Sequence, residues 1–128
     1  MNKNTVEKLL KKWQQTLRLQ DWDITAEIVR TKWRKSGDVK VDSENKNAVL
    51  LVNHKPKCKD LEEIVVHELL HVKLYGLDQM LEDLINAVYG SKRTKQRQFA
   101  WNQFMLQLES TVEDLTKGYL YSAKSSEH

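Results

Sequence analysis

Two histidines and a glutamate stand close together in the segment His67-Glu68-Leu69-Leu70-His71, which has the pattern HExxH. In a helix, four residues advance by about 400°, so both imidazoles project from one face and can bind a single zinc ion through neutral nitrogens. Glu68 lies about 100° round the helix from His67, beside the metal position rather than aimed at it. This position suits a general base that acts on a water activated by the metal. The segment therefore predicts a zinc site formed by His67 and His71, with Glu68 as the catalytic residue.

The residues around the motif favour a buried helix for it. Asp60, with Glu63 three residues later, has the pattern of a capping box and predicts a helix from about Leu61 to Tyr75, ended by Gly76. Apolar residues surround the motif within this helix, at Ile64, Val65, Leu70 and Leu74. The structural alternative is a pair of surface histidines one turn apart on an ordinary amphipathic helix.

A third ligand is needed, because catalytic zinc normally takes three protein ligands and leaves one position for water. The longer pattern HExxHxxGxxH is excluded, since Leu74 and Leu77 stand where it requires Gly and His. Neither His54, at a strand end, nor His128, near the end of the sequence, is well placed for a rigid site. The downstream carboxylates are Asp78, Glu82, Asp83, Glu109, Glu113 and Asp114.

The long helix predicted from about Gln96 to Tyr119 carries the carboxylate that we favour as third ligand. Its apolar positions are Trp101, Phe104, Met105, Leu108, Val112, Leu115 and Tyr119. On a helical wheel, Glu109 lies roughly 80° from the centre of this apolar stripe and Glu113 roughly 120°. Glu109 is therefore closest to the buried face, and we predict that it completes the zinc site. Glu113 and Glu82 are the alternatives.

The segments before the motif predict a helix followed by a small sheet. Apolar residues spaced three and four apart over 6–19 predict an amphipathic helix, capped by Asn4 or Thr5. Alternating apolar and polar residues predict strands over 22–29 and 38–42.

A third strand is predicted at Ala48-Val-Leu-Leu-Val, which is apolar on both faces. We expect it to be covered on both sides or to lie beside a cleft. If residues 48–54 form an exposed edge, they can bind an extended substrate by strand addition; a plain core strand is the equal alternative.

The order of helix, strands and further helices favours an α+β fold. We expect a sheet of about three strands packed on the N-terminal helix and the motif helix, then a short helix over 80–89, a polar link and the long C-terminal helix. At 128 residues the chain has room for one domain, which we place at residues 1–121, with a flexible C-terminal tail at 122–128.

The net charge of +3 conceals an uneven distribution. Residues 1–59 hold 14 Lys or Arg against 7 Asp or Glu, whereas residues 60–128 hold 7 against 11. A basic half can attract nucleic acid, but these cations are predicted to be spread over a helix and several strands. Nucleic-acid binding is therefore an alternative that we do not favour.

Composition and the lack of long apolar runs argue for a cytoplasmic location. No run approaches the roughly 20 apolar residues that a membrane span requires, and the first residues lack the features of a signal peptide. A single cysteine, Cys58, cannot form an internal disulfide, which fits a reducing compartment.

The chain resembles the zincin metallopeptidases over most of its length. The resemblance runs from Trp22-Asp-Ile through the predicted strands and includes Val65-Val-His-Glu-Leu-Leu-His-Val and Glu109-Ser-Thr-Val-Glu-Asp-Leu. The resemblance is to the small single-domain gluzincin-like proteins, or minigluzincins, and to HExxH proteins encoded in phages and prophages. Glu109 follows His71 by 38 residues, longer than the usual gluzincin spacing, and Leu108 and Val112 replace the Asn and Asp of the gluzincin pattern.

This resemblance implies a zincin-like fold, with a small sheet above the active-site helix and a cleft below the sheet's edge strand. It implies that His67, His71 and Glu109 bind Zn²⁺ and that Glu68 is the general base in peptide-bond hydrolysis. We expect a cytoplasmic, phage-related, monomeric metallopeptidase acting on a protein or peptide, with no membrane association. An oxyanion donor is expected among Tyr75, Tyr89, Tyr119 and Tyr121. The rival function is a non-catalytic module that binds zinc, a protein partner or nucleic acid.

Overall fold

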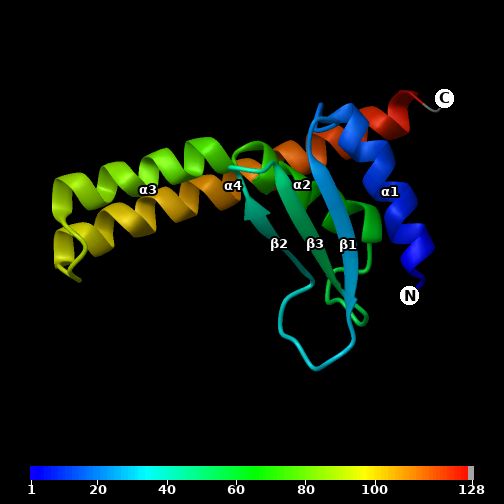
Figure 1. Cartoon of the computed structure of the whole chain (residues 1–128), viewed down its shortest axis with the longest axis horizontal. Helices are drawn as coiled ribbons and strands as arrows, with labels where there is room; N and C mark the ends of the chain where they lie inside the picture. The colour runs from blue at the N-terminus through cyan, green and yellow to red at the C-terminus, as the bar shows by residue number, and fades with distance from the viewer. Residues whose placement is uncertain (127–128) are drawn as a thin grey trace.

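The structure, a computed structural model, describes residues 1–126 and shows an α+β fold built on a three-stranded mixed sheet (Figure 1). Its elements, in chain order, are α1 (Lys3–Thr16), β1 (Asp23–Val29), β2 (Gly37–Asp42), β3 (Asn47–Asn53), α2 (Leu61–Lys73), α3 (Tyr75–Tyr89) and α4 (Lys95–Ser126). Within these residues, no helix has an apolar stretch long enough to cross a lipid bilayer.

β3 is the central strand of the sheet, pairing in parallel with β1 and antiparallel with β2. Both of its edges are therefore used, so of the two alternatives for residues 48–54 the core strand is confirmed and the exposed edge is excluded. The prediction of cover on both faces was wrong. Ala48, Leu50 and Val52 are buried on one face, whereas Val49 and Leu51 are partly exposed on the other.

The strand order brings two loops to one end of the sheet. Because β3 lies between β1 and β2, the loop of residues 30–36 must pass the end of β3, where residues 54–60 leave toward α2. Asn53, which is buried, joins the two loops. Its side-chain amide donates hydrogen bonds to the carbonyl oxygens of Trp33 (2.9 Å) and Lys35 (2.8 Å).

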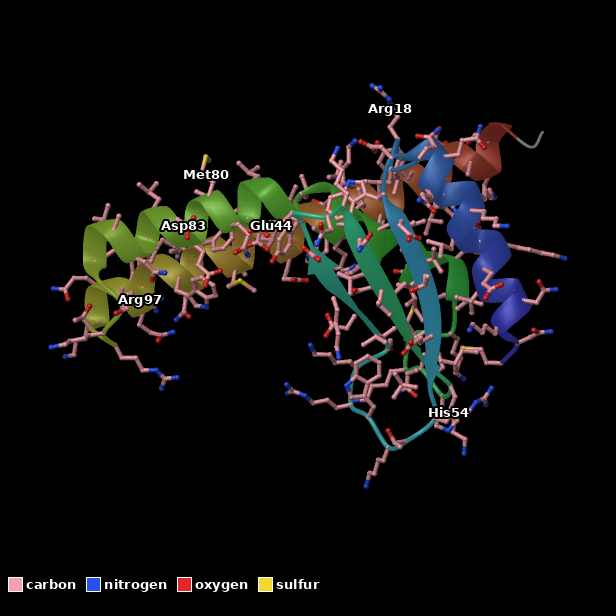
Figure 2. All side chains as sticks on the ribbon, in the orientation of Figure 1. Arg18, Glu44, His54, Met80, Asp83 and Arg97 are labelled. Carbon is pink, nitrogen blue, oxygen red and sulfur yellow. The ribbon has the colours of Figure 1, made fainter. Side chains whose placement is uncertain are left out.

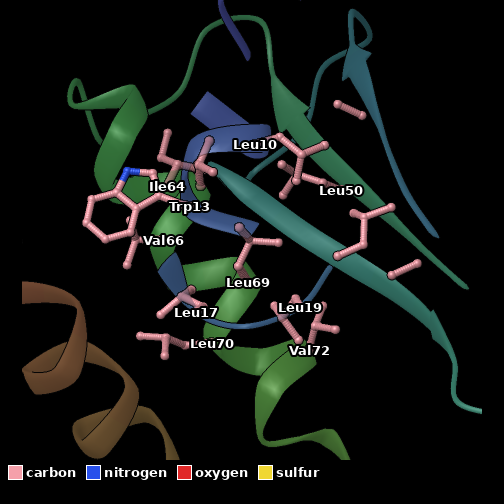
Figure 3. Close-up of a cluster of buried hydrophobic side chains, with 14 of the residues drawn as sticks. Leu10, Trp13, Leu17, Leu19, Leu50, Ile64, Val66, Leu69, Leu70 and Val72 are labelled. Carbon is pink, nitrogen blue, oxygen red and sulfur yellow. The ribbon is translucent and has the colours of Figure 1, made fainter. Parts of the chain in front are cut away.

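α1 and α2 cover the buried face of the sheet, and the core lies between them and the strands (Figure 3). Trp13 of α1, Leu50 of β3 and Leu69 of α2 are almost fully buried within it. α4 packs against another side of α2 and buries Val112 and Thr116. These contacts leave α2 exposed mainly along the line of His67 and His71.

α3 and α4 form a helical hairpin that extends away from the sheet (Figure 1). Near its tip, the Arg97 guanidinium donates to the side-chain oxygen of Asn86 at 2.7 Å. Ile85 is buried between the helices, whereas Met80 points away from α4 (Figure 2). The hairpin fixes the direction in which α4 returns to α2.

The first helix begins earlier than the sequence predicts. Asn2, rather than Asn4 or Thr5, is the N-cap of α1, and its side chain accepts a hydrogen bond from the backbone N–H of Asn4 at 2.8 Å. The helix ends at Thr16. Leu17 and Leu19 are also buried, but they follow the helix. The apolar spacing in the sequence therefore continues past the end of α1.

The prediction that Gly76 ends the motif helix was wrong. α2 ends at Lys73, with Leu74 as its C-cap, and α3 begins at Tyr75, so Gly76 lies within the next helix. Gly76 does not have positive φ, the conformation that makes glycine a helix terminator, whereas Gly90, which follows α3, has φ of 76°.

The long helix does not end at Tyr119. α4 continues to Ser126, so residues 122–126, predicted to be tail, are helical; residues 127–128 lie outside the described part of the chain. Leu120 is buried and Ala123 packs against the core. This late apolar contact supports the extra helical turns.

We expect Glu62→Ala to lower the free energy of unfolding by about 1–3 kcal/mol, because a buried indole N–H loses its acceptor. Nε1 of Trp13 donates to Oε2 of Glu62 at 2.7 Å, and Nζ of Lys12 lies 3.0 Å from the same oxygen. Urea unfolding followed by circular dichroism measures the loss. In the control Glu7→Ala, which removes only an exposed pair with Lys3, the change should stay below about 0.5 kcal/mol. Equal losses in both variants would contradict the prediction.

β2 lies close against α2 at Gly37, and we expect Gly37→Ala to destabilise the protein by about 1–3 kcal/mol. A Cβ at this position would lie 2.7 Å from Cγ2 of Ile64 and 3.3 Å from Cγ of Glu68, so β2 would have to move away from α2. Gly76→Ala is the matched control, since a Cβ there meets nothing within 4 Å. It should be neutral or stabilising by up to about 1 kcal/mol. Thermal melting that ranks the two variants the other way would disprove the close approach.

Candidate metal centre

His67 and His71 lie one turn apart on the side of α2 that the core leaves open. Their ring centroids are 5.1 Å apart and their planes are inclined by 56°. Their side chains are 29% and 19% exposed, so both rings remain reachable from solvent. Burial lowers the pKa of His71, and neighbouring His67 lowers it further against the opposing effect of Glu109. Histidine in this neutral state can offer a nitrogen lone pair to a metal.

Glu109 reaches the two histidines from α4. Val112, one turn later on the same helix, is fully buried, and Leu108 packs against the core. These contacts hold α4 against α2 and leave Glu109 on the flank of the buried stripe, as the helical wheel predicts. Its Oε1 lies 3.3 Å from Nε2 of His71, and its Oε2 lies 3.6 Å from Nε2 of His67.

The three side chains fit a zinc ion by their spacing and by their chemistry. One potential ligand atom from each of His67, His71 and Glu109 can be chosen so that all lie within 4.8 Å of one another. Ligands on a tetrahedral zinc with bonds of about 2.0–2.1 Å are separated by about 3.4 Å. The two histidine-to-glutamate separations, 3.3 and 3.6 Å, are close to that value. Two imidazoles and one carboxylate are a donor set that zinc accepts in catalytic sites.

The alternative ligands stand outside this group. Among residues 1–126, the group of His67, His71 and Glu109 is the one His, Cys, Asp and Glu cluster with spacing suited to a metal, and Glu82 and Glu113 do not belong to it. His54 lies at the end of β3, with Nδ1 3.0 Å from the carbonyl oxygen of Val29. His128 is outside the described residues.

Glu68 is the most perturbed ionisable group at the site. Glu68 is 8% exposed and lies where Gly37 of β2 packs against α2. Burial raises the pKa of Glu68 to about 8, with further contributions from the negative charges of Asp38 and Glu109, while Lys35 opposes the shift. A carboxyl group in such surroundings binds a proton much more readily than one in water.

A cleft of about 640 Å³ opens over these side chains. Its walls come from β2 and the loop before it, from α2 and the loop before it, from the start of α3 and from the middle of α4. The lining residues include Lys35, Gly37, Asp38, Cys58, Glu68, Tyr75, Asp78 and Glu109, with both histidines. β2, and not β3, is the strand beside the cleft.

The cleft distinguishes among the four candidate tyrosines. Tyr75 lines it. Tyr89 is at the far end of α3, and Tyr121 is 75% exposed. Tyr119 packs edge-on against Trp13, with ring centroids 6.3 Å apart. Tyr75 is therefore the tyrosine placed to reach a molecule in the cleft.

Sequence reasoning missed Lys35 and Asp38, which face the cleft across the start of β2. Nζ of Lys35 lies 3.2 Å from Oδ2 of Asp38. No sequence motif includes either residue. They could have been found only from the sheet order, because residues at the start of an edge strand that packs beside the motif helix must lie near the cleft. Asp78 was considered only as a ligand. It lines the cleft near His71, and burial raises the pKa of its carboxyl group.

Cys58 lies at the rim of the cleft, not at the candidate zinc site. Its Sγ is 3.7 Å from Oε2 of Glu63, and its backbone N–H donates to Oγ of Ser36 at 3.1 Å. Partial burial, reinforced by the Glu63 charge, raises the pKa of the thiol. The thiolate, the form that binds metals and reacts, is therefore disfavoured near neutral pH.

Comparison of the chain with protein-family models, with curated proteins and with solved structures found no significant match.

Proposed function

We propose that this protein is a zinc-dependent metallopeptidase with a zincin-like, gluzincin-type site. The observation that carries the proposal is the convergence of Glu109, from α4, on His67 and His71 of α2. Buried Glu68 lies on the same helix, and a cleft opens above all four residues. The sequence pattern suggested these roles, and the convergence of two helices far apart in the sequence supports them.

His67, His71 and Glu109 would hold the ion. Bound there, zinc would supply Lewis-acid polarisation of a peptide carbonyl and would lower the pKa of a water molecule. The burial of α2 and its packing against α4 fix the positions of the two helices that carry these side chains before any metal arrives. This preorganisation reduces the entropy that binding must overcome.

Glu68 would carry the proton during hydrolysis. As a base it accepts a proton from the attacking water while the new C–O bond forms; as an acid it returns that proton to the amine nitrogen as the C–N bond breaks. The pKa of Glu68 is about 8 in the metal-free site, and a cation bound nearby would lower it and so favour the carboxylate that a general base requires. The phenol of Tyr75, at the cleft wall, is available to donate to the carbonyl oxygen as negative charge develops there.

β2 would align the substrate. Its inner edge pairs with β3, and its other edge has no strand partner within the described sheet. Residues 37–39 and Val41 line the cleft. An extended peptide could therefore pair with the backbone of β2 and bring its scissile bond over α2.

The first test concerns the third ligand. We expect the purified protein to bind about one zinc ion per chain, and Glu109→Gln to weaken zinc affinity at least about 100-fold, because losing a residue outside the ligand set already costs 10–100-fold. Competition with a chromophoric chelator measures the affinity. Glu113→Gln, on the same helix but outside the cluster, is the matched control and should bind zinc like the wild type. Equal affinities for all three proteins would exclude Glu109.

The second test separates catalysis from metal binding. With a peptide library made from a whole-cell digest, we expect Glu68→Gln to reduce cleavage at least about 100-fold, as loss of a general base does. Its zinc affinity should stay within a few-fold of the wild type. Glu63→Gln, a cleft-lining change on the same helix, should retain activity.

Mass spectrometry of the library measures both the sites and the rates of cleavage. If the zinc-loaded wild type cleaves no peptide, or if Glu68→Gln cleaves at the wild-type rate, the peptidase assignment is wrong. A zinc-binding module without catalysis would then be the better account of the same three ligands.

A further inference from the structure

The two loops that meet at one end of the sheet form a cationic surface, which we call the basic end and define as residues 30–36 and 54–59. Its cations are Arg30, Lys32, Arg34, Lys35, Lys55, Lys57 and Lys59. All seven residues are exposed, and neither segment contains an aspartate or a glutamate. The strand order explains this concentration of charge, because it brings the two segments together from different parts of the sequence.

Most of these cations have no carboxylate partner. In the described part of the chain, Lys35 is the one member of the basic end with an ion pair, at 3.2 Å from Asp38. The nearby carboxylate of Asp60 is already occupied, since it caps α2 by accepting from the backbone N–H groups of Glu62 and Glu63. Clustered cations repel one another, and a polyanion would relieve that repulsion.

The basic end is held in shape by hydrogen bonds between its loops. In addition to the two bonds from Asn53, the backbone N–H of His54 donates to the carbonyl oxygen of Val29 at 3.0 Å. Cys58 N–H donates to Oγ of Ser36 at 3.1 Å, so the second loop is tied to the end of β1 at its start and to the first loop near its end. Figure 2 shows His54 at this end of the sheet, away from the helical hairpin. The lysines and arginines of the basic end are therefore carried by loops that hydrogen bonds hold together.

An aromatic side chain lies among the cations. Trp33 sits between Lys32 and Arg34 in the sequence and is partly exposed, while its backbone carbonyl is fixed by Asn53. Cations that contact phosphates, combined with an aromatic face on which a base can stack, are the elements of single-strand recognition. An anionic lipid surface would use the same charges, but its head groups offer no aromatic face on which Trp33 can stack.

We propose that the basic end binds single-stranded nucleic acid, with its lysines and arginines on the phosphates and Trp33 stacked on a base. Lys35, Ser36 and Cys58 belong both to the basic end and to the cleft lining, so a bound strand would lie beside the cleft. If the proposed peptidase function holds, its substrates include proteins bound to nucleic acid. Binding of the strand itself does not require that function.

Fluorescence anisotropy with a labelled 20-nucleotide single-stranded DNA of mixed sequence tests the proposal. EDTA in every sample removes any contribution of a bound metal, so the outcome is independent of the peptidase test. We expect saturable binding at 50 mM NaCl that weakens steeply as salt is added. No change in anisotropy with 50 μM protein at 50 mM NaCl would overturn the proposal.

Two independent double variants, Lys32→Ala/Arg34→Ala and Lys55→Ala/Lys57→Ala, locate the site. Each should weaken binding about 10-fold and reduce the slope of log Kd against log salt by about 1.4, or about 0.7 for each phosphate that the protein no longer neutralises. Lys92→Ala/Arg93→Ala is the matched control, since it removes the same charge from the exposed turn between α3 and α4. An equal loss in this control would mean that general attraction, not the basic end, explains the binding.

Trp33 distinguishes a nucleic-acid strand from other polyanions. Trp33→Leu should weaken binding about 5-fold or more, whereas Trp33→Tyr, which keeps an aromatic face, should restore most of the affinity. Thermal melting checks that both variants are folded. Equal binding by the two variants, tighter binding to a duplex of the same length, or tighter binding to phosphatidylserine vesicles would each contradict the proposal.

Discussion

The burial of α2 is the constraint on which the rest of the structure depends. The sheet and α1 cover one side of this helix and α4 packs against another, so its apolar residues are enclosed almost throughout. This packing leaves one side of α2 accessible to solvent, the side that carries His67 and His71. It also places Glu68 out of water, which gives that carboxyl group its raised pKa. The candidate site is thus a consequence of how completely one helix is packed.

The contact between α2 and α4 is the second part of this constraint. Val112 and Thr116 are buried against the core, and Thr116 satisfies its hydroxyl within the helix by donating to the carbonyl oxygen of Val112 at 2.7 Å. The buried hydroxyl at this contact therefore does not need water. Two helices can pack closely enough for Glu109 to reach the histidines.

Periodicity in the sequence was sufficient to predict the regular elements and the side of α4 that faces the core. The strand over 22–29, the capped motif helix and the position of Glu109 beside the apolar stripe all follow from local patterns, because each depends on which residues share a face. The role of Glu109 as a zinc ligand stays a prediction. Periodicity could not show that residues 48–54 are central in the sheet, since strand order is decided by contacts between distant segments.

Helix ends were predicted less well for a physical reason. Gly76 resembles a terminator in sequence, but a glycine ends a helix only when the backbone turns into positive φ, as at Gly90. Similarly, α4 extends past Tyr119 because Leu120 and Ala123 find apolar contacts on the core, and those contacts are not visible in α4 alone. Tertiary packing decided both boundaries.

The distribution of charge shows most clearly that tertiary structure cannot be read from local sequence patterns. Counted by halves of the sequence, the cations of residues 1–59 are predicted to be dispersed over a helix and several strands, which argues against a nucleic-acid surface. The strand order instead gathers seven of those 14 cations into two loops joined by Asn53, with a partly exposed tryptophan among them. A net charge of +3 averages this surface with the acidic lining of the neighbouring cleft. The relevant quantity for a polyanion is the local density of unpaired charge, because attraction acts over about 10 Å at moderate salt. On that scale the molecule presents two oppositely charged regions that share Lys35, and binding at one would hold a partner beside the other.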